Sequence, residues 1–236
     1  MTSSPPVPHA RAGRDAHRTA VEVLARGIAD GTYAIGTQLQ LAVLTAQLGA
    51  AEPVIGGALH ALASKGLVTT AGVVRPQPEW NLLDSDVLRW LLTSGATPWP
   101  DGFISDLHEL RRAVEPSAAA LAAQHRSADD LSALDQALTV MAAAQQTPDP
   151  DPALAARADA AFHTTLLAAS GNRFFAHLAR VIIPALTARN RKVHAGPHHS
   201  PLPAHTEVAA CVRERDADGA YTAMLELLDV SQRDDP

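Results

Sequence analysis

Asp159 and His163 are the residues of this sequence whose types and spacing most directly suggest chemistry. They lie four positions apart, so a helix would place both side chains on one face, in line with Leu166. A carboxylate oxygen and an imidazole nitrogen at this spacing form half of a divalent-metal site, because both reach one ion without backbone strain. His205 lies in helical register with Val208 and is expected to point into the same interior. A pair of this kind is more often structural than metal-binding, so the spacing alone leaves both interpretations open.

Arg111 occupies the inward edge of another expected helix, one turn beyond Leu107 and three residues before Val114. Glu115 follows one turn later, where it can hold the guanidinium group in place. Guanidinium groups pair with carboxylates through two parallel hydrogen bonds. Arg111 is therefore suited either to an internal salt bridge or to a carboxylate ligand.

The composition restricts the classes of protein that could carry these residues. The chain has 236 residues, of which 47% are hydrophobic and 19% charged, enough apolar material for a packed core. Its formal net charge of −6 excludes a protein that coats nucleic acid through bulk positive charge. The single cysteine, Cys211, excludes a disulfide framework. The sequence has neither the apolar run of a signal peptide nor a stretch long enough to span a membrane, so we expect a soluble, cytoplasmic protein without a membrane partner.

The N-terminal part is typical of a winged helix-turn-helix domain at residues 17–76. Residues 1–16 are rich in Pro, Ser and Arg and are expected to form a flexible arm. Apolar spacing then predicts helices over about 17–30, 39–48 and 53–65, separated by glycine-containing turns. A short hairpin is expected around residues 71–72. Three short helices followed by a hairpin form the outline of a winged helix-turn-helix.

The remainder of the chain predicts helices throughout. Residues 77–101 are expected to hold a linker and a linking helix at 84–94. Further helices are expected near 102–125, 128–146, 151–169, 172–194, 203–214 and 216–230. Alanine is common here and strand formers are scarce, which predicts an all-α helical bundle at 102–236. The predicted fold class is therefore mainly α, with an N-terminal winged helix-turn-helix and a C-terminal helical bundle.

Several longer strings form a pattern that spans both predicted domains. They are GLV at 66–68, WNLLDSDVLRW at 80–90, LRRAVEPSAAALAA at 110–123, DAAFH at 159–163, SGN at 170–172, His205, and DADGA at 216–220. Together these strings resemble the FadR branch of the GntR superfamily of bacterial transcriptional regulators, with its C-terminal effector domain, the FCD domain. The resemblance implies a homodimer, a winged-helix DNA reader, and a bundle that binds a small carboxylate or sugar acid, commonly through a metal.

The same resemblance implies a divalent metal, zinc or similar, held by Asp159, His163 and His205. Many members of the family have another histidine 22 residues after His205, and Leu227 occupies that position here. The resemblance therefore denies this chain the fourth ligand. Three histidines in a loop that contains Gly and Pro are candidate substitutes: His194, His198 and His199.

The resemblance also implies an effector pocket beside the metal. Arg111 becomes the partner of an effector carboxylate, and Glu115 becomes the residue that holds it. Asn172 either caps the helix that follows Gly171 or contributes a polar group to the pocket.

The expected DNA-reading surface departs from the family pattern. The family usually has Ser-Glu-Arg at the start of the second helix and two arginines around the start of the third. Glu52 and Gly56 occupy the positions of these two arginines here, and LQLA at 39–42 replaces the motif at the start of the second helix. No Lys or Arg occurs from residue 27 to residue 64, so a carboxylate faces the place where phosphates bind. DNA contacts would then fall to the arm and the wing, on Arg11, Arg14, Arg18 and Arg75.

Two main functions follow from these observations. The first is a ligand-responsive GntR/FadR-type regulator whose DNA contacts are atypical or weakened. The alternative is a repurposed regulator fold that no longer binds DNA and acts as an enzyme or a ligand-binding protein through the same pocket. In an enzyme the catalytic candidates would be His163, His205 and Arg111, although no reaction is indicated. A protein that dimerises with intact relatives is a third possibility.

Overall fold

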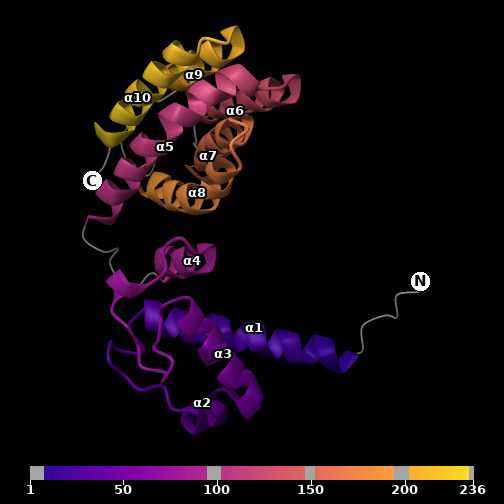
Figure 1. Cartoon of the computed structure of the whole chain (residues 1–236), viewed down its shortest axis with the longest axis vertical. Helices are drawn as coiled ribbons and strands as arrows, with labels where there is room; N and C mark the ends of the chain where they lie inside the picture. Colours follow the sequence, from indigo (N-terminus) through magenta and orange to yellow (C-terminus); the bar gives the residue numbers. More distant parts are fainter. Residues whose placement is uncertain (1–7, 95–101, 147–151, 194–201, 234–236) are drawn as a thin grey trace. The chain divides into compact units, whose positions relative to one another are not determined.

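The computed structural model describes residues 8–94, 102–146, 152–193 and 202–233 of the chain (Figure 1). The chain divides into two compact units, Met1–Pro100 and Asp101–Pro236. Helices make up most of both units. The mainly α fold class expected from the sequence is therefore confirmed.

The first unit contains the three helices of a helix-turn-helix domain and a fourth helix that follows them. They are α1 (Pro8–Ala29), α2 (Leu41–Leu48), α3 (Glu52–Ser64) and α4 (Ser85–Thr93), with the short 3-10 helix η1 (Gln77–Glu79) before α4. α3 packs against α1 and α2, and α4 packs against α1. The contact faces bury Leu24 of α1, Leu44 of α2, and Ile55, Ala58 and Leu62 of α3, the last three at helical spacing. Within the described ranges no helix by itself has the length and apolar composition of a membrane span, although the bent pair α2–α3 reaches them together.

The wing of this unit is a short antiparallel hairpin, as the sequence predicts. Backbone bridges pair Val68 with Val74, and Val73 with Gln38. The N–H of Thr69 donates to the carbonyl of Val73 at 2.8 Å. Gly72 has a φ of 83° and permits the reversal. The helices and this hairpin confirm the winged helix-turn-helix.

The first helix starts earlier than the sequence suggested. We expected a flexible arm over 1–16 and a helix from about residue 17, but α1 begins at Pro8. Proline is well tolerated in the first turn of a helix, and the residues that follow are mostly helix formers, so the helix extends through Gly13. Residues 1–7 lie outside the part of the chain that the structure describes. The prediction of a flexible arm was therefore wrong for residues 8–16.

Glu22 connects α1 to α4. Its carboxylate accepts two hydrogen bonds from Arg89, at 2.9 and 3.0 Å, and one from the indole nitrogen of Trp90 at 2.8 Å. Arg26 donates to the same carboxylate at 2.9 Å. The helix that the sequence assigned to the linker is thus attached to the first helix of the winged helix-turn-helix domain.

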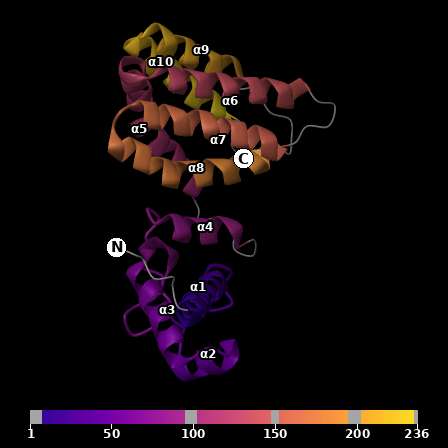
Figure 2. The same ribbon diagram turned by 90° about the vertical axis from the view of Figure 1, so that its right-hand side faces the viewer.

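The second unit is an all-α bundle arranged around α5 (Figure 2). Its helices are α5 (Phe103–His125), α6 (Ala128–Gln146), α7 (Pro152–Ala169), α8 (Arg173–Val193), α9 (Leu202–Glu214) and α10 (Ala217–Arg233). α5 packs against α7, α8, α9 and α10, and α6 packs against α7 and α9. Each helix expected over 102–236 is present, with ends shifted by a few residues.

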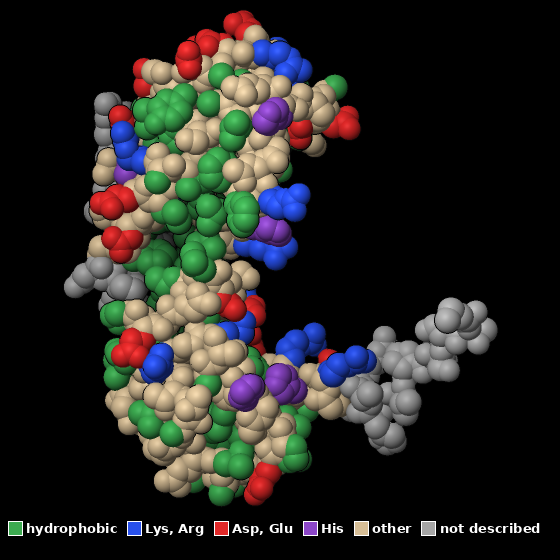
Figure 3. Space-filling model, viewed as in Figure 1, with side chains coloured by type: hydrophobic (Ala, Val, Ile, Leu, Met, Phe, Trp, Pro, Cys, Tyr) green, Lys and Arg blue, Asp and Glu red, His purple; other side chains and the backbone are tan. Residues whose placement is uncertain are grey.

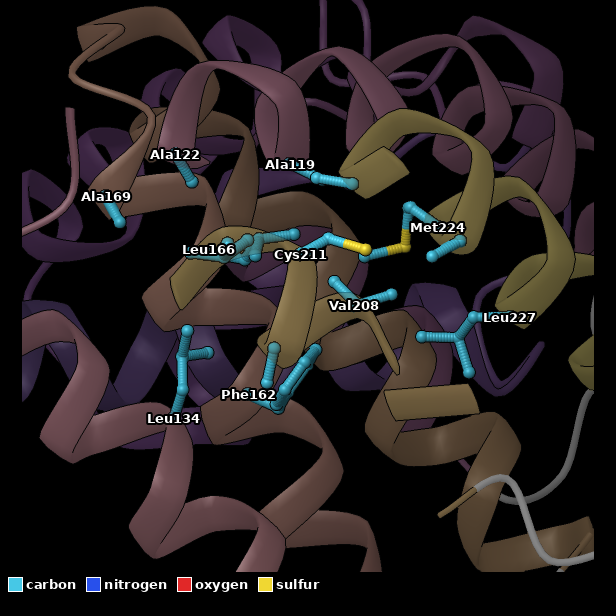
Figure 4. Close-up of a cluster of buried hydrophobic side chains, with 14 of the residues drawn as sticks. Ala119, Ala122, Leu134, Phe162, Leu166, Ala169, Val208, Cys211, Met224 and Leu227 are labelled. Carbon is cyan, nitrogen blue, oxygen red and sulfur yellow. The ribbon is translucent and has the colours of Figure 1, made fainter. Parts of the chain in front are cut away.

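One apolar core joins α5, α6, α7, α9 and α10 (Figure 4), and a second, smaller cluster packs Ile182 of α8 against α5 and α7. α7 contributes Phe162 and Leu166, α9 contributes Val208, and α10 contributes Met224 and Leu227, all fully buried. Alanines on α5 let the neighbouring helices approach closely, because a methyl side chain leaves little between two backbones. This core fixes the faces of α5, α7 and α9 on which the polar site is built.

Candidate functional site

Three buried polar side chains converge in the second unit, Asp159 and His163 from α7 and His205 from α9. Oδ1 of Asp159 lies 3.0 Å from Nε2 of His205 and 3.7 Å from Nε2 of His163. Each residue offers one ligand atom, and these atoms all lie within 4.8 Å of one another. Ligands about 2.0–2.1 Å from a tetrahedral zinc ion lie roughly 3.4 Å from each other. The triad therefore fits a divalent ion in donor type, number and spacing.

The surrounding apolar side chains hold these three groups in place. His163 and His205 are each 1% exposed and Asp159 is 8% exposed. The ring of Phe162 packs edge-on against His205, with centroids 4.8 Å apart, and against His163 at 5.7 Å. Such packing restricts both imidazoles to narrow orientations. The donor atoms are thus positioned by the core rather than by flexible surface loops.

Asp159 is ionised in this environment. Burial by itself would raise the pKa of the carboxyl group, but His163 and His205 outweigh burial and hold the pKa below its ordinary value. The ionised carboxylate is the form that binds a cation.

Arg111 and Glu115 on α5 extend the site on the other side of His163. Nε of Arg111 donates to Oε1 of Glu115 at 2.8 Å. Oε2 of the same carboxylate lies 2.6 Å from Nδ1 of His163, and Nη2 of Arg111 lies 3.3 Å from Nε2 of His163. Arg111 is 2% exposed and Glu115 is fully buried. The two residues therefore form one connected network with the proposed metal ligand.

The charge state of Glu115 determines the tautomer of His163. Complete burial would raise the pKa of Glu115, but Arg111 and His163 outweigh it and lower the pKa to about 2. An ionised carboxylate only accepts hydrogen bonds, so the tautomer of His163 that pairs with Glu115 across this 2.6 Å distance is the one with its proton on Nδ1. Nε2 then keeps its lone pair and faces Asp159 and Arg111.

Leu227 stands at the position where a fourth metal ligand was expected to be missing, and its side chain is a hydrocarbon. Leu227 is fully buried in the core beside Val208 and Met224 (Figure 4). A leucine offers no ligand atom, so any further ligand of an ion must come from elsewhere. The three loop histidines named as substitutes, His194, His198 and His199, lie outside the described residues.

Asn172 lies at the start of α8, where its Oδ1 accepts the backbone N–H of Phe174 at 2.9 Å. This is helix-capping geometry, and a role for Asn172 in an effector pocket stays a prediction. Arg112, next to Arg111, pairs with Asp229 at the surface. Only the first of these two adjacent arginines faces the buried site.

The contact between Glu115 and His163 was not predicted from the sequence. One signal was available, since Glu115 lies one turn from Arg111 on an otherwise apolar, alanine-rich helix face. A carboxylate in such a position needs buried partners. The sequence did not indicate which histidine from a distant helix would supply one.

The sequence-predicted DNA contacts lie in the first unit. Arg14 and Arg18 are exposed on α1, and Arg18 pairs with Asp15 at 3.2 Å. Arg75 follows the wing and pairs with Glu79 at 3.2 Å. Arg11 belongs to α1, but its side chain lies outside the described part. Their role in DNA binding stays a prediction.

The surface of the helix-turn-helix itself carries little positive charge. Glu52 is the first residue of α3 and is exposed. Figure 3 shows apolar and uncharged side chains over α2, with no Lys or Arg among them. Exposed apolar side chains in this region include Ile35, Leu41 and Val43. A phosphate backbone would find few charged partners on this surface.

Comparison with known proteins identifies similar chains for both units. A model of the FCD domain matches residues 106–230. The galactonate operon transcriptional repressor of Escherichia coli is 28% identical over 221 residues, which cover 90% of this chain and 93% of that protein. The HTH-type transcriptional regulator YieP of Escherichia coli is 26% identical over 215 residues, covering 88% and 90%. The GntR structure from Streptococcus agalactiae has a TM-score of 0.51 at 24% identity and covers 92% of this chain and 99% of that one, which supports the fold alone.

Proposed function

Because this chain belongs to the FCD-domain branch of the GntR family of transcriptional regulators, we propose that it responds to a small carboxylate or sugar acid. The proposed ligand binds in the second unit, beside a divalent metal held by Asp159, His163 and His205. The observation that carries the proposal is the convergence of these three buried donors with Arg111, whose Nη2 lies 3.3 Å from His163. A buried cation site and a guanidinium group together suit an anion.

The charges at the site favour binding of a cation first and of an anion afterwards. With neutral histidines, Asp159 and Glu115 carry two negative charges and Arg111 carries one positive charge. A divalent ion would reverse the sign of this sum, and charges inside a buried site interact strongly because little water screens them. When bound, the ion supplies positive charge and open coordination positions for ligand oxygens. Arg111 supplies a second point of attachment, which favours a ligand with a carboxylate.

The chemical class is also consistent with one relative. The name of the Escherichia coli repressor refers to a galactonate operon, and galactonate is a sugar acid with one carboxylate and several hydroxyl groups. Galactonate is therefore a reasonable first probe for this chain, alongside related aldonates.

In this proposal the regulator is a cytoplasmic homodimer, and ligand binding alters how its two DNA-binding domains are held. A ligand changes such an equilibrium only by binding the two states with different affinity. DNA contacts fall mainly to the start of α1 and to the wing, since the helix-turn-helix has no Lys or Arg from residue 27 to residue 64.

Two measurements test the proposal. The first is calorimetric titration of galactonate into zinc-loaded protein, with Arg111→Met expected to weaken binding and Arg112→Met, on the exposed side of the same helix, expected to leave it unchanged. The second is a gel-shift assay at low salt with the DNA upstream of its own coding sequence, with and without galactonate. Absence of DNA binding in both states would count against regulation by direct DNA contact.

A second function remains a candidate because the helix-turn-helix has no Lys or Arg from residue 27 to residue 64. A protein of this fold that has lost DNA binding would use the pocket of the second unit as a ligand-binding protein or as an enzyme. The exposed Glu52 at the start of α3 favours this alternative, since it would repel phosphate. Ligand binding in calorimetry without any gel shift would support it. A partner that dimerises with intact relatives would instead show DNA binding only when such a relative is present.

A further inference from the structure

The guanidinium group of Arg111 lies where it interferes with metal binding at His163. Because Nδ1 of His163 faces Glu115 at 2.6 Å, Nε2 is the atom left for an ion. Nη2 of Arg111 lies 3.3 Å from that same Nε2. A lone pair that accepts a hydrogen bond is not available to coordinate a metal at the same time.

We infer that Arg111 acts as an internal cation that occupies Nε2 of His163 until a divalent ion displaces it, and that this displacement frees Nη2 for the carboxylate of the effector. The inference rests on the proposed function and adds to it a reason for the order of binding. Once an ion takes Nε2 of His163, the guanidinium group of Arg111 is presented to an anion.

The geometry permits this exchange without breaking the whole network. Arg111 contacts Glu115 through Nε at 2.8 Å and through Nη2 at 3.5 Å, and the same Nη2 lies 3.3 Å from Nε2 of His163. The Nε–Glu115 bond joins residues one turn apart on α5 and does not depend on His163. Nη2 carries two hydrogens, so the one that faces His163 can lose its partner while the paired contacts of Nε and Nη2 with Glu115 remain. Both states keep the guanidinium charge compensated, which burial requires.

Thermodynamic linkage makes the consequence measurable. If metal binding releases Arg111, zinc increases the affinity for a carboxylate, and the carboxylate increases the affinity for zinc by the same factor. If Arg111 competes with zinc, its removal tightens zinc binding even though it weakens carboxylate binding. A residue that only anchors the effector would not change the affinity for zinc in the absence of effector.

The decisive measurement is the dissociation constant of zinc, obtained by competition with a chelator in the absence of any carboxylate. It is made on the full-length protein and on Arg111→Met, Arg111→Lys and Arg112→Met. Loss of a hydrogen bond from a charged donor corresponds to about tenfold in affinity, so Arg111→Met is expected to bind zinc about tenfold more tightly. Arg112→Met removes a charge from the neighbouring exposed position and is expected to match the unsubstituted protein.

Arg111→Lys separates the hydrogen bond from simple charge. Lysine keeps the positive charge but has a single nitrogen, which Glu115 holds, so zinc binding is expected to tighten here as well. If Arg111→Lys has the zinc affinity of the unsubstituted protein while Arg111→Met binds zinc more tightly, charge alone explains the effect and the inference is overturned. If all four proteins bind zinc equally, the inference is wrong and the proposed metal site stands. If none binds zinc, both the inference and the proposed metal site are wrong.

A measurement on the unsubstituted protein covers the case in which the variants do not fold. Nuclear magnetic resonance of the arginine side chains reports whether the Nη2 protons of Arg111 are held. We expect slow exchange of these protons without zinc and fast exchange with zinc, while the Nε–H stays bonded to Glu115. Unchanged Nη2 signals on zinc saturation would contradict the displacement.

Discussion

Oε2 of Glu115 lies 2.6 Å from Nδ1 of His163, and both side chains are buried in the second unit. A carboxylate in this position orients the imidazole ring, favours the tautomer with an unprotonated Nε2, and increases the electron density that the ring offers to an ion. Glu115 also accepts a hydrogen bond from Arg111 at 2.8 Å. One carboxylate on α5 thus controls both the proposed metal ligand and the proposed effector anchor.

Replacing Glu115 is expected to weaken metal binding although Glu115 is not itself a ligand. Glu115→Gln should lower the affinity for zinc by about 10–100-fold, the usual effect of removing a carboxylate behind a ligating histidine. The chelator competition assay measures it. Glu109→Gln, an exposed change on the same helix, is the control and should have no effect. Equal zinc affinity in both variants would show that Glu115 does not support the site.

Zinc is expected to stabilise the folded protein. An ion that binds only the native state raises the free energy of unfolding by RT ln(1 + [L]/Kd), about 2.7 kcal/mol at a hundred times Kd. The thermal midpoint should therefore rise with zinc and fall again with a chelator. His205→Ala should lose this response, and His177→Ala, an exposed histidine on α8, should keep it. A zinc-induced rise that persists in His205→Ala would place the ion elsewhere.

The attachment of α1 to α4 should depend on pH through Glu22. The hydrogen bonds from Arg89 lower the pKa of Glu22 most, burial opposes them, and Trp90 and Arg26 add to the lowering, so the pKa is about 2 instead of 4.5. Because the folded pKa is depressed, the stabilisation is fully present above about pH 4.5 and is lost as the pH falls toward 2.

Glu22→Gln should accordingly lower the free energy of unfolding of the first unit by about 1–2 kcal/mol at neutral pH. The difference from the unsubstituted protein should shrink between pH 4.5 and 2, as measured by urea unfolding followed through tryptophan fluorescence. Asp15→Asn removes the exposed pair with Arg18 and should cost less than about 0.5 kcal/mol. A Glu22→Gln effect that is constant with pH would exclude the ion pair as its cause.

The missing positive charge of the helix-turn-helix surface can be tested by adding arginines to it and measuring the affinity for DNA. Glu52→Arg combined with Gly56→Arg should raise the affinity for DNA and steepen its salt dependence by roughly one or two charges. Gly56 has room for a side chain, since a Cβ there would meet no atom within 4 Å. Glu109→Arg with Ser105→Arg makes the same charge change on α5 and is the control. Anisotropy titrations at several salt concentrations measure the DNA affinity of both proteins. Equal increases in affinity would mean that positive charge favours DNA binding wherever it is added.

Two glycines in the first unit should respond in opposite ways to alanine. Gly56→Ala should stabilise the protein by about 0.5–1 kcal/mol, because it removes backbone freedom from the unfolded chain inside a helix that has space. Gly66 has a φ of 83°, and a Cβ there would lie 2.7 Å from the carbonyl oxygen of Glu79. Gly66→Ala should therefore destabilise the protein by at least about 1 kcal/mol. Denaturant midpoints compare the two, and a stabilising Gly66→Ala would show that this turn does not need glycine.

The helical architecture followed from local information in the sequence. Apolar residues at helical spacing, Gly49 and Gly66 at helix ends, and the scarcity of strand formers after residue 83 predicted the helices closely. The start of α1 was the exception, because Pro8 opens a helix that composition had suggested was an arm. Composition describes a segment on average, whereas helix initiation depends on one or two residues.

By itself, then, the sequence determined the mainly α fold, the family resemblance, and the facing of Asp159 and His163 on one helix, since all of these depend on neighbours along the chain. Only the tertiary structure decided that His205 of α9 lies 3.0 Å from Asp159, that Glu115 of α5 lies against His163, and that Glu22 binds Trp90. These contacts join residues that are distant in sequence. Their partners are selected by how whole helices pack and by the need of each buried charge for compensation, which no local pattern contains.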